Sequence, residues 1–119
     1  MHKTDFMCDH INAAHSAALA AALRRSREPY RRCPGCRVMV YDRALADWLV
    51  SDGRAVAWGL QAMLLLSPVI WPGVVSGRRR HPDVKLAYAR TFVDSLASRF
   101  SSRALELVYE PAPRGELRH

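Results

Sequence analysis

The hydrophobic residues between positions 84 and 100 recur at every fourth position. The members of this ladder are Val84, Tyr88, Phe92, Leu96 and Phe100. Because residues four apart share one face of an α-helix, the ladder predicts an amphipathic helix with its apolar side turned to a core. Pro82 suits the first turn of this helix, where a backbone N–H has no intrahelical partner.

The alanine-rich residues 9–27 predict another long helix. Asp9 or Asn12 is the expected N-cap, and the helix is expected to end at Glu28-Pro29. Four residues of this segment share a face and are expected to point inward: Ile11, His15, Leu19 and Leu23. The neighbouring alanines are small enough to let a second helix approach closely.

Three shorter elements are expected between and after these helices. Residues 37–41 and 104–109 have the composition and alternation of strands, and they are expected to pair with each other. Asp42 is placed to cap a helix that ends at Gly53, with Leu45, Trp48 and Leu49 as its apolar stripe.

Residues 55–75 contain no charged side chain, which permits two interpretations. We expect a buried helix over residues 54–66, because Ser67-Pro68 favours an end near Leu66. Such a helix has about 13 residues and a length of ~20 Å, which is too short for a ~30 Å hydrocarbon layer. A membrane-associated segment over residues 55–75 is the alternative, since basic residues follow it.

Together, the elements predict an α+β fold that is mainly α. We expect about four helices, a small two-stranded β element and a zinc knuckle in one domain. The compact domain is expected to cover residues 1–110 of the 119, and a flexible tail is expected over residues 111–119.

The zinc prediction comes from the Cys33-Pro34-Gly35-Cys36 sequence. A redox pair of the thioredoxin type follows a buried strand and opens a helix, whereas here a strand-like run follows. Nearby arginines favour thiolates, which zinc requires, so structural Zn²⁺ is the preferred interpretation. The predicted ligands are Cys8, His10, Cys33 and Cys36, with His15 as a substitute for His10. This set requires the first helix to begin between residues 9 and 12.

The charge of the chain predicts an anionic partner. Basic residues outnumber acidic ones by 18 to 11, giving a net charge of +7, and all but two of the basic residues are arginine. We expect phosphate contacts with nucleic acid or a nucleoprotein complex, although arginine also reflects a GC-rich genome. The candidate contacts are Arg24, Arg25, Arg27, Tyr30, Arg31, Arg32, Arg37, Arg78, Arg79 and Arg80, with Tyr30 as a stacking residue.

The alternative is an adaptor or inhibitor that docks on an acidic protein, with Ile70 and Trp71 as apolar anchors. Small basic proteins of phages and mobile elements that act on host machinery fit this description. No sequence motif of a nucleophile, a phosphate-binding glycine loop or a metalloprotease is present, so enzymatic activity is not expected. An odd cysteine count and the lack of a secretory signal predict a cytoplasmic, reducing location.

Overall fold

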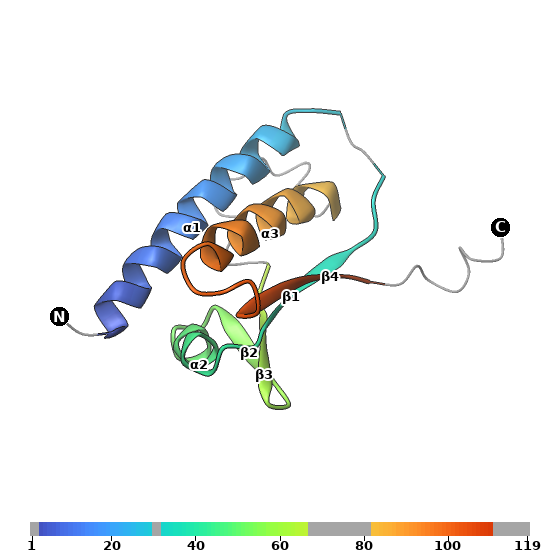
Figure 1. Ribbon diagram of the computed structural model, residues 1–119. Helices are drawn as coiled ribbons and strands as arrows, with labels where there is room; N and C mark the ends of the chain where they lie inside the picture. The colour runs from blue at the N-terminus through green and yellow to red at the C-terminus, as the bar shows by residue number, and fades with distance from the viewer. Residues whose placement is uncertain (1–2, 30–31, 67–81, 111–119) are drawn as a thin grey trace.

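The computed structural model describes residues 3–29, 32–66 and 82–110. In these ranges it contains three helices and four strands (Figure 1). In chain order they are α1 (Lys3–Ser26), β1 (Cys36–Val40), α2 (Arg43–Ser51), β2 (Ala55–Trp58), β3 (Gln61–Leu64), α3 (Pro82–Ala97) and β4 (Leu105–Tyr109).

The four strands form one antiparallel sheet in the order β2-β3-β1-β4. One row of paired residues crosses all four strands: Val56, Met63, Met39 and Glu106. From β1 to β4 the connectivity is β-α-β-β-α-β, the split β-α-β topology. This topology supports many unrelated activities and does not by itself indicate a function.

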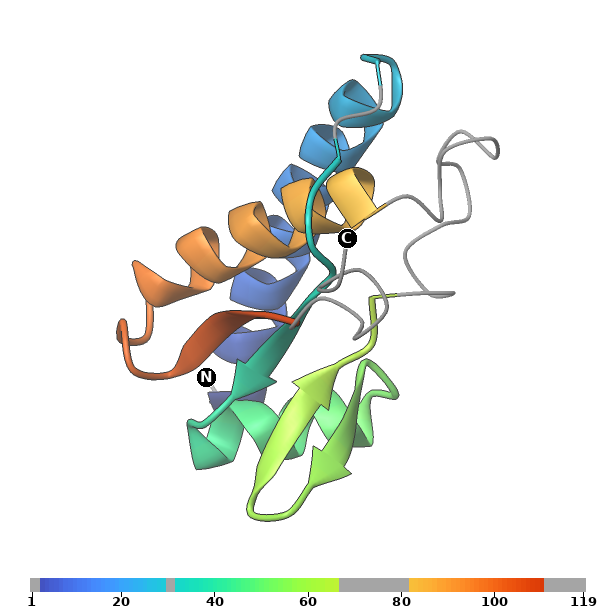
Figure 2. The same cartoon turned by 90° about the vertical axis from the view of Figure 1, so that its right-hand side faces the viewer.

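All three helices lie on the same side of the sheet (Figure 2). α3 packs on β1 and β4, and α2 packs on β2 and β3. Val38 and Val40 of β1 point into this layer and are fully buried. Met39 is also buried but lies outside the core cluster, because alternate residues of a strand point to opposite faces.

α1 packs against α3 through small side chains. Ala14, Ala18 and Ala22 are buried at spacings of four residues, whereas His15, Leu19 and Leu23 flank them and are only partly buried. The inward face predicted for this helix is therefore rotated by one position. Alanines at the contact let the two helix backbones approach closely, so the long α1 is held by α3.

The prediction of a helix over residues 54–66 is wrong. β2 and β3 form a hairpin joined by the two residues Gly59 and Leu60. Gly59 has a φ of 63° and Leu60 has no positive φ, which is the pattern of a type II′ turn. The described residues thus contain one helix fewer and two strands more than predicted, and no zinc knuckle is found among them.

Several other local predictions are confirmed. β1 pairs with β4 as expected for residues 37–41 and 104–109. The Asp42 side chain accepts a hydrogen bond from the Leu45 N–H at 2.9 Å and caps α2, and Gly53 has a φ of 76°. Among the described residues no helix is long and apolar enough to cross a membrane. Residues 67–75 and the predicted tail over 111–119 lie outside the described ranges.

The α1–α3 contact predicts that a larger side chain at Ala18 destabilises the protein. Ala18 is fully buried, so Ala18→Leu forces the helices apart and is expected to cost about 1–3 kcal/mol. Urea unfolding followed by circular dichroism measures this change. Ala17→Leu is the matched control, because Ala17 is exposed on the same helix, and it is expected to change stability by no more than about 0.5 kcal/mol. Equal costs at both positions would contradict the close helix contact.

Candidate functional site

The structure does not bring the four predicted zinc ligands together. Among the described residues, which include all four, no group of three or more His, Cys, Asp or Glu side chains could hold a metal ion. α1 begins at Lys3 rather than after Cys8, so Cys8 and His10 lie within a continuous helix. Cys33 lies in a groove with Arg25, and 17 residues of helix separate Cys8 from Arg25 by ~26 Å.

Each ligand predicted on α1 has a different neighbour instead. Cys8 Sγ accepts a hydrogen bond from Asn12 Nδ2 at 3.4 Å, and the His10 ring lies edge-on to Phe100 at a centroid distance of 6.1 Å. That Zn²⁺ binds to the protein at all stays a prediction, but the proposed cluster is not part of the fold.

The Cys33-Pro34-Gly35-Cys36 segment enters the sheet as extended chain. Cys36 is the first residue of β1, and the backbone N–H of Glu110 donates to the Gly35 carbonyl at 2.8 Å, which continues the β1–β4 pairing. Cys36 is buried in the core on the helix side of the sheet, and Cys33 lines a groove on that same side.

The groove around Cys33 collects arginines that are far apart in the sequence. It has a volume of about 250 Å³ and combines the end of α1, the segment before β1 and the first half of α3. Its lining residues are Arg25, Arg32, Cys33, Asp83, Leu86, Ala87 and Arg90. We call this surface the arginine groove.

Arg25 and Asp83 hold the inner wall of the arginine groove. Arg25 Nε donates to Asp83 Oδ2 at 3.2 Å, and their side chains are only 15% and 5% exposed. The same guanidinium donates to Glu28 Oε1 at 2.6 Å and to the Pro29 carbonyl. Three acceptors thus fix one planar cation, which joins α1 to α3.

The outer wall carries two exposed arginines. Arg90 donates to the Tyr109 hydroxyl at 2.9 Å, so α3 and β4 jointly position it, and Arg32 lines the same groove from the segment before β1. Sequence reasoning included Arg25 and Arg32 but missed Arg90 and Asp83. In the sequence, Arg90 is recognisable only as a polar residue outside the apolar ladder. Its position beside Cys33 depends on how α3 packs on the sheet, which is a long-range contact.

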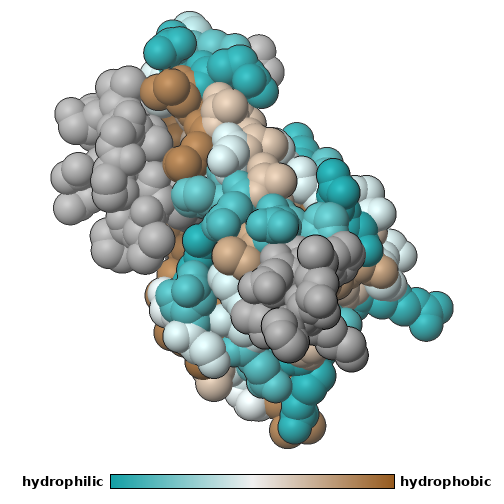
Figure 3. Space-filling model, turned by 90° about the vertical axis from the view of Figure 1, so that its left-hand side faces the viewer, coloured by the Kyte–Doolittle hydropathy of each residue, from teal (hydrophilic) through white to brown (hydrophobic). Residues whose placement is uncertain are grey.

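The other predicted contacts are distributed differently. Arg24 and Arg27 are exposed at the end of α1, which forms the top of the molecule, where hydrophilic residues gather in Figure 3. Arg37 alternates with the core residues of β1 and belongs to the face of the sheet away from the helices. Seven predicted contact residues lie outside the described ranges: Tyr30, Arg31, Ile70, Trp71, Arg78, Arg79 and Arg80.

The arginines of the groove do not create reactive thiolates. Burial and the nearby Asp83 carboxylate raise the pKa of Cys33, and Arg25 and Arg90 offset only part of this effect. Burial, with Cys33 and Glu110, raises the pKa of Cys36 to about 11. Both cysteines are therefore protonated at neutral pH, which contradicts our expectation of thiolates and disfavours a redox pair.

A second polar cluster surrounds His15. The His15 Nδ1 and the Tyr88 hydroxyl share a hydrogen bond of 2.7 Å beside a cavity of about 250 Å³. Arg54 borders the same cavity, where it donates to Asp52 and to Asn12 at 2.7 and 3.0 Å. Burial and the Arg54 charge lower the pKa of His15, and burial raises that of Tyr88. Because these groups satisfy one another, we assign the cluster to the packing of α1 and α3 against the α2–β2 loop.

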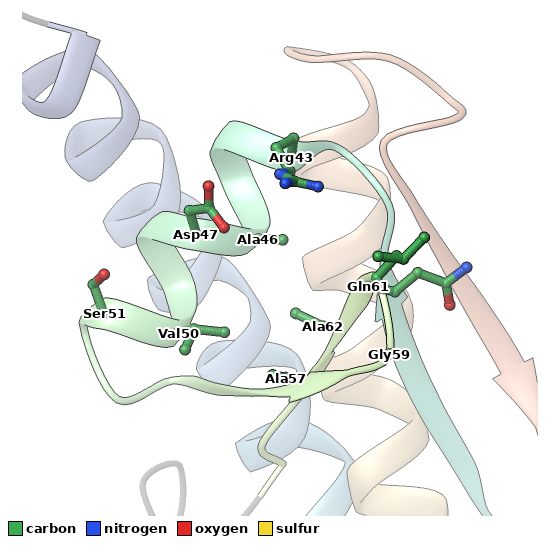
Figure 4. Close-up of a pocket in the computed structure, with 10 residues that line it drawn as sticks. Arg43, Ala46, Asp47, Val50, Ser51, Ala57, Gly59, Gln61 and Ala62 are labelled. Atoms are coloured by element: carbon green, nitrogen blue, oxygen red, sulfur yellow. The ribbon is translucent and has the colours of Figure 1, made fainter.

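A shallow groove lies between α2 and the β2–β3 hairpin (Figure 4). It has a volume of about 370 Å³, and its floor consists of Ala46, Ala57 and Ala62. Arg43 and Asp47 lie on the α2 side of the opening. The groove offers apolar surface and two opposite charges, but no convergent set of catalytic groups.

Comparison with known proteins gives no relative. No protein-family model, no curated protein and no solved structure matches the chain. The assignment of a function therefore depends on the side chains and surfaces described above.

The raised pKa of Cys33 predicts slow alkylation at neutral pH. Only the thiolate reacts, so the rate with iodoacetamide is expected to be below that of a free cysteine peptide at pH 7 and to keep rising beyond the pH at which that peptide reaches its plateau. Mass spectrometry of the Cys33 peptide measures the rate at each pH. A rate that reaches its plateau below pH 8 would show an activated thiolate and contradict this assignment.

The lowered pKa of His15 predicts a loss of stability in mild acid. In the unfolded chain the imidazole binds a proton below about pH 6.5, whereas the folded protein keeps it neutral to lower pH. The contribution of neutral His15 to folding stability is therefore complete above about pH 6.5, and it is lost as the pH falls below that value. Urea midpoints at pH 7.5 and 5.5 are expected to differ more for the native chain than for His15→Gln. The same difference in both proteins would exclude His15 as the group that titrates.

Proposed function

We propose that the protein binds the phosphate groups of a nucleic acid through the arginine groove. The observation that supports this proposal is the convergence of Arg25, Arg32 and Arg90 on one groove from three separate segments. Guanidinium groups form paired hydrogen bonds to phosphate oxygens, and they bind phosphate well when they are held in place.

The arginines of the groove have two roles in this proposal. Arg25 is mostly buried and already has three acceptors, so it supports the wall. Arg32 and Arg90 are exposed, and they supply positive charge that Asp83, paired with Arg25, does not neutralise. Arg24 and Arg27 extend the basic surface along the last turn of α1 and beyond it.

The residue types that line the groove favour contact with the backbone of a nucleic acid rather than with its bases. The lining residues are charged, aliphatic or cysteine, and the described part of the groove has no aromatic platform on which a base stacks. Phosphate contacts position a protein without reading sequence. We therefore expect weak sequence selectivity and a strong dependence on salt.

Removing the two exposed arginines tests the proposal. Arg32→Gln/Arg90→Gln is expected to weaken binding of a labelled 20-nucleotide RNA or DNA. It should also reduce the slope of log affinity against log salt by about 1 for each arginine. Fluorescence anisotropy between about 50 and 200 mM salt measures both quantities. The substitutions lie on the surface, so circular dichroism should be unchanged.

Arg99→Gln/Arg103→Gln is the matched control. Both arginines are exposed beyond the end of α3, so this variant loses the same charge at a different place. It is expected to keep most of the affinity and the salt slope. Equal losses in both double variants would mean that net charge, and not the groove, attracts the nucleic acid.

The competing role, docking on an acidic protein, uses the same positive charge. Capture of partners from a lysate before and after nuclease treatment distinguishes the two roles. Loss of the captured material after nuclease supports nucleic-acid binding, and retention of a protein supports the adaptor. The three free cysteines are consistent with the cytoplasmic location that we propose for this function.

A further inference from the structure

The two edges of the sheet differ in how they are protected. β4 carries Glu106 at its second position, and this carboxylate accepts a hydrogen bond from Tyr41 at 2.6 Å. A charge on an edge strand discourages pairing with another strand. β2, at the opposite edge, has the sequence Ala-Val-Ala-Trp and contains neither a charged residue nor proline.

Exposed apolar side chains gather around the unprotected edge. Six large hydrophobic residues are exposed in the described part of the chain, and four belong to α2 or to the β2–β3 hairpin. These four are Val50, Val56, Trp58 and Leu60, with exposed fractions of 39, 38, 51 and 89%. The groove of Figure 4 lies beside them on the helix side of the hairpin.

The backbone of β2 has hydrogen-bonding groups directed away from the sheet. Trp58 and Gln61 flank the two-residue turn and are paired, so their backbone groups face each other. By alternation, the N–H and C=O groups of Ala55 and Ala57 point to the free edge. An extended strand placed antiparallel to β2 can satisfy them.

A second copy of β2 is complementary to this edge. With a two-fold axis at Ala57, the two Ala57 residues exchange hydrogen bonds, and Val56 lies opposite Trp58 of the other copy. Both side chains are on the face of the sheet away from the helices, so two aromatic–aliphatic cross-strand pairs form. The groove beside each hairpin carries Arg43 and Asp47. The same two-fold axis turns this groove towards the equivalent surface of the partner, which carries the same two opposite charges.

We propose that two copies of the chain associate through antiparallel pairing of their β2 strands in the register centred on Ala57. The pairing joins two four-stranded sheets into one of eight strands, and it covers Val56 and Trp58. A contact of four or five residues per chain is small, so the dimer is expected to be weak and concentration-dependent.

Sedimentation equilibrium of the nuclease-treated protein tests the association. The average mass is expected to rise from 13.4 kDa towards twice that value between about 10 µM and 1 mM, the range in which weak complexes form. A mass that stays at one chain throughout would overturn the proposal, even if β2 recruits a strand from another protein.

Charge substitutions test the register. Val56→Lys/Trp58→Lys and Val56→Glu/Trp58→Glu each place like charges opposite one another, so each is expected to stay monomeric. A mixture of these two variants is expected to form a heterodimer, because every Lys then faces a Glu. Val56→Lys/Trp58→Glu keeps the net charge of the native chain and is expected to dimerise by itself.

Two controls complete the experiment. Tyr109→Lys places a charge at a similarly exposed aromatic residue, 48% exposed, on the β4 edge and is expected to leave dimerisation unchanged. Circular dichroism confirms that each variant is folded, since both substituted β2 side chains lie on the surface. Dimers of the Lys/Lys variant, or no heterodimer in the mixture, would show that another surface or register is used.

Discussion

The packing of α1 on α3 is the contact on which the arginine groove depends. Ala14, Ala18 and Ala22 bring the helix backbones together, and this register places Arg25 beside Asp83. A buried carboxylate needs a partner, because removing a charge from water costs several kcal/mol when it is unpaired. The ion pair therefore anchors the end of α1 to the start of α3. The exposed Arg32 and Arg90 line the groove beside this anchor.

Elements with strong local signals were predictable from the sequence. The ladder from Val84 to Leu96, the cap at Asp42 and the alternation in residues 104–109 each act within a few residues, and all three appear in the structure. The last member of the predicted ladder, Phe100, lies beyond the end of α3 and is only partly buried. Residues 55–64 were mispredicted because an uncharged run fits a buried helix as well as a strand pair. The available signal was Gly59, which allows a two-residue turn between short apolar runs. Pairing with β1 decides the outcome, and that contact is long-range.

The candidate site shows the same division between local and long-range information. The Cys-x-x-Cys spacing suggested a knuckle, but β4 continues its pairing to Gly35 and draws the segment into the sheet, and no third ligand lies beside the two thiols in the described residues. The predicted arginines near the end of α1 were local in sequence, and part of that cluster does line the groove. Arg90 was beyond local reasoning, because its place next to Cys33 follows from the contact between α3 and the sheet.

The two proposed surfaces lie at opposite edges of the sheet, β4 and β2, and their combination therefore has a physical consequence. Arg90 of the groove is bonded to Tyr109 on β4, whereas the proposed dimer contact is β2. In an eight-stranded dimer sheet the two β4 strands are the outer edges, seven strand spacings or about 34 Å apart. If the arginine groove binds phosphate as proposed, a single groove would make few contacts and bind weakly by itself. Two grooves at this separation would then reach different phosphates of one nucleic acid, and the second contact would be intramolecular, so dimerisation would raise affinity without any new contact at either groove.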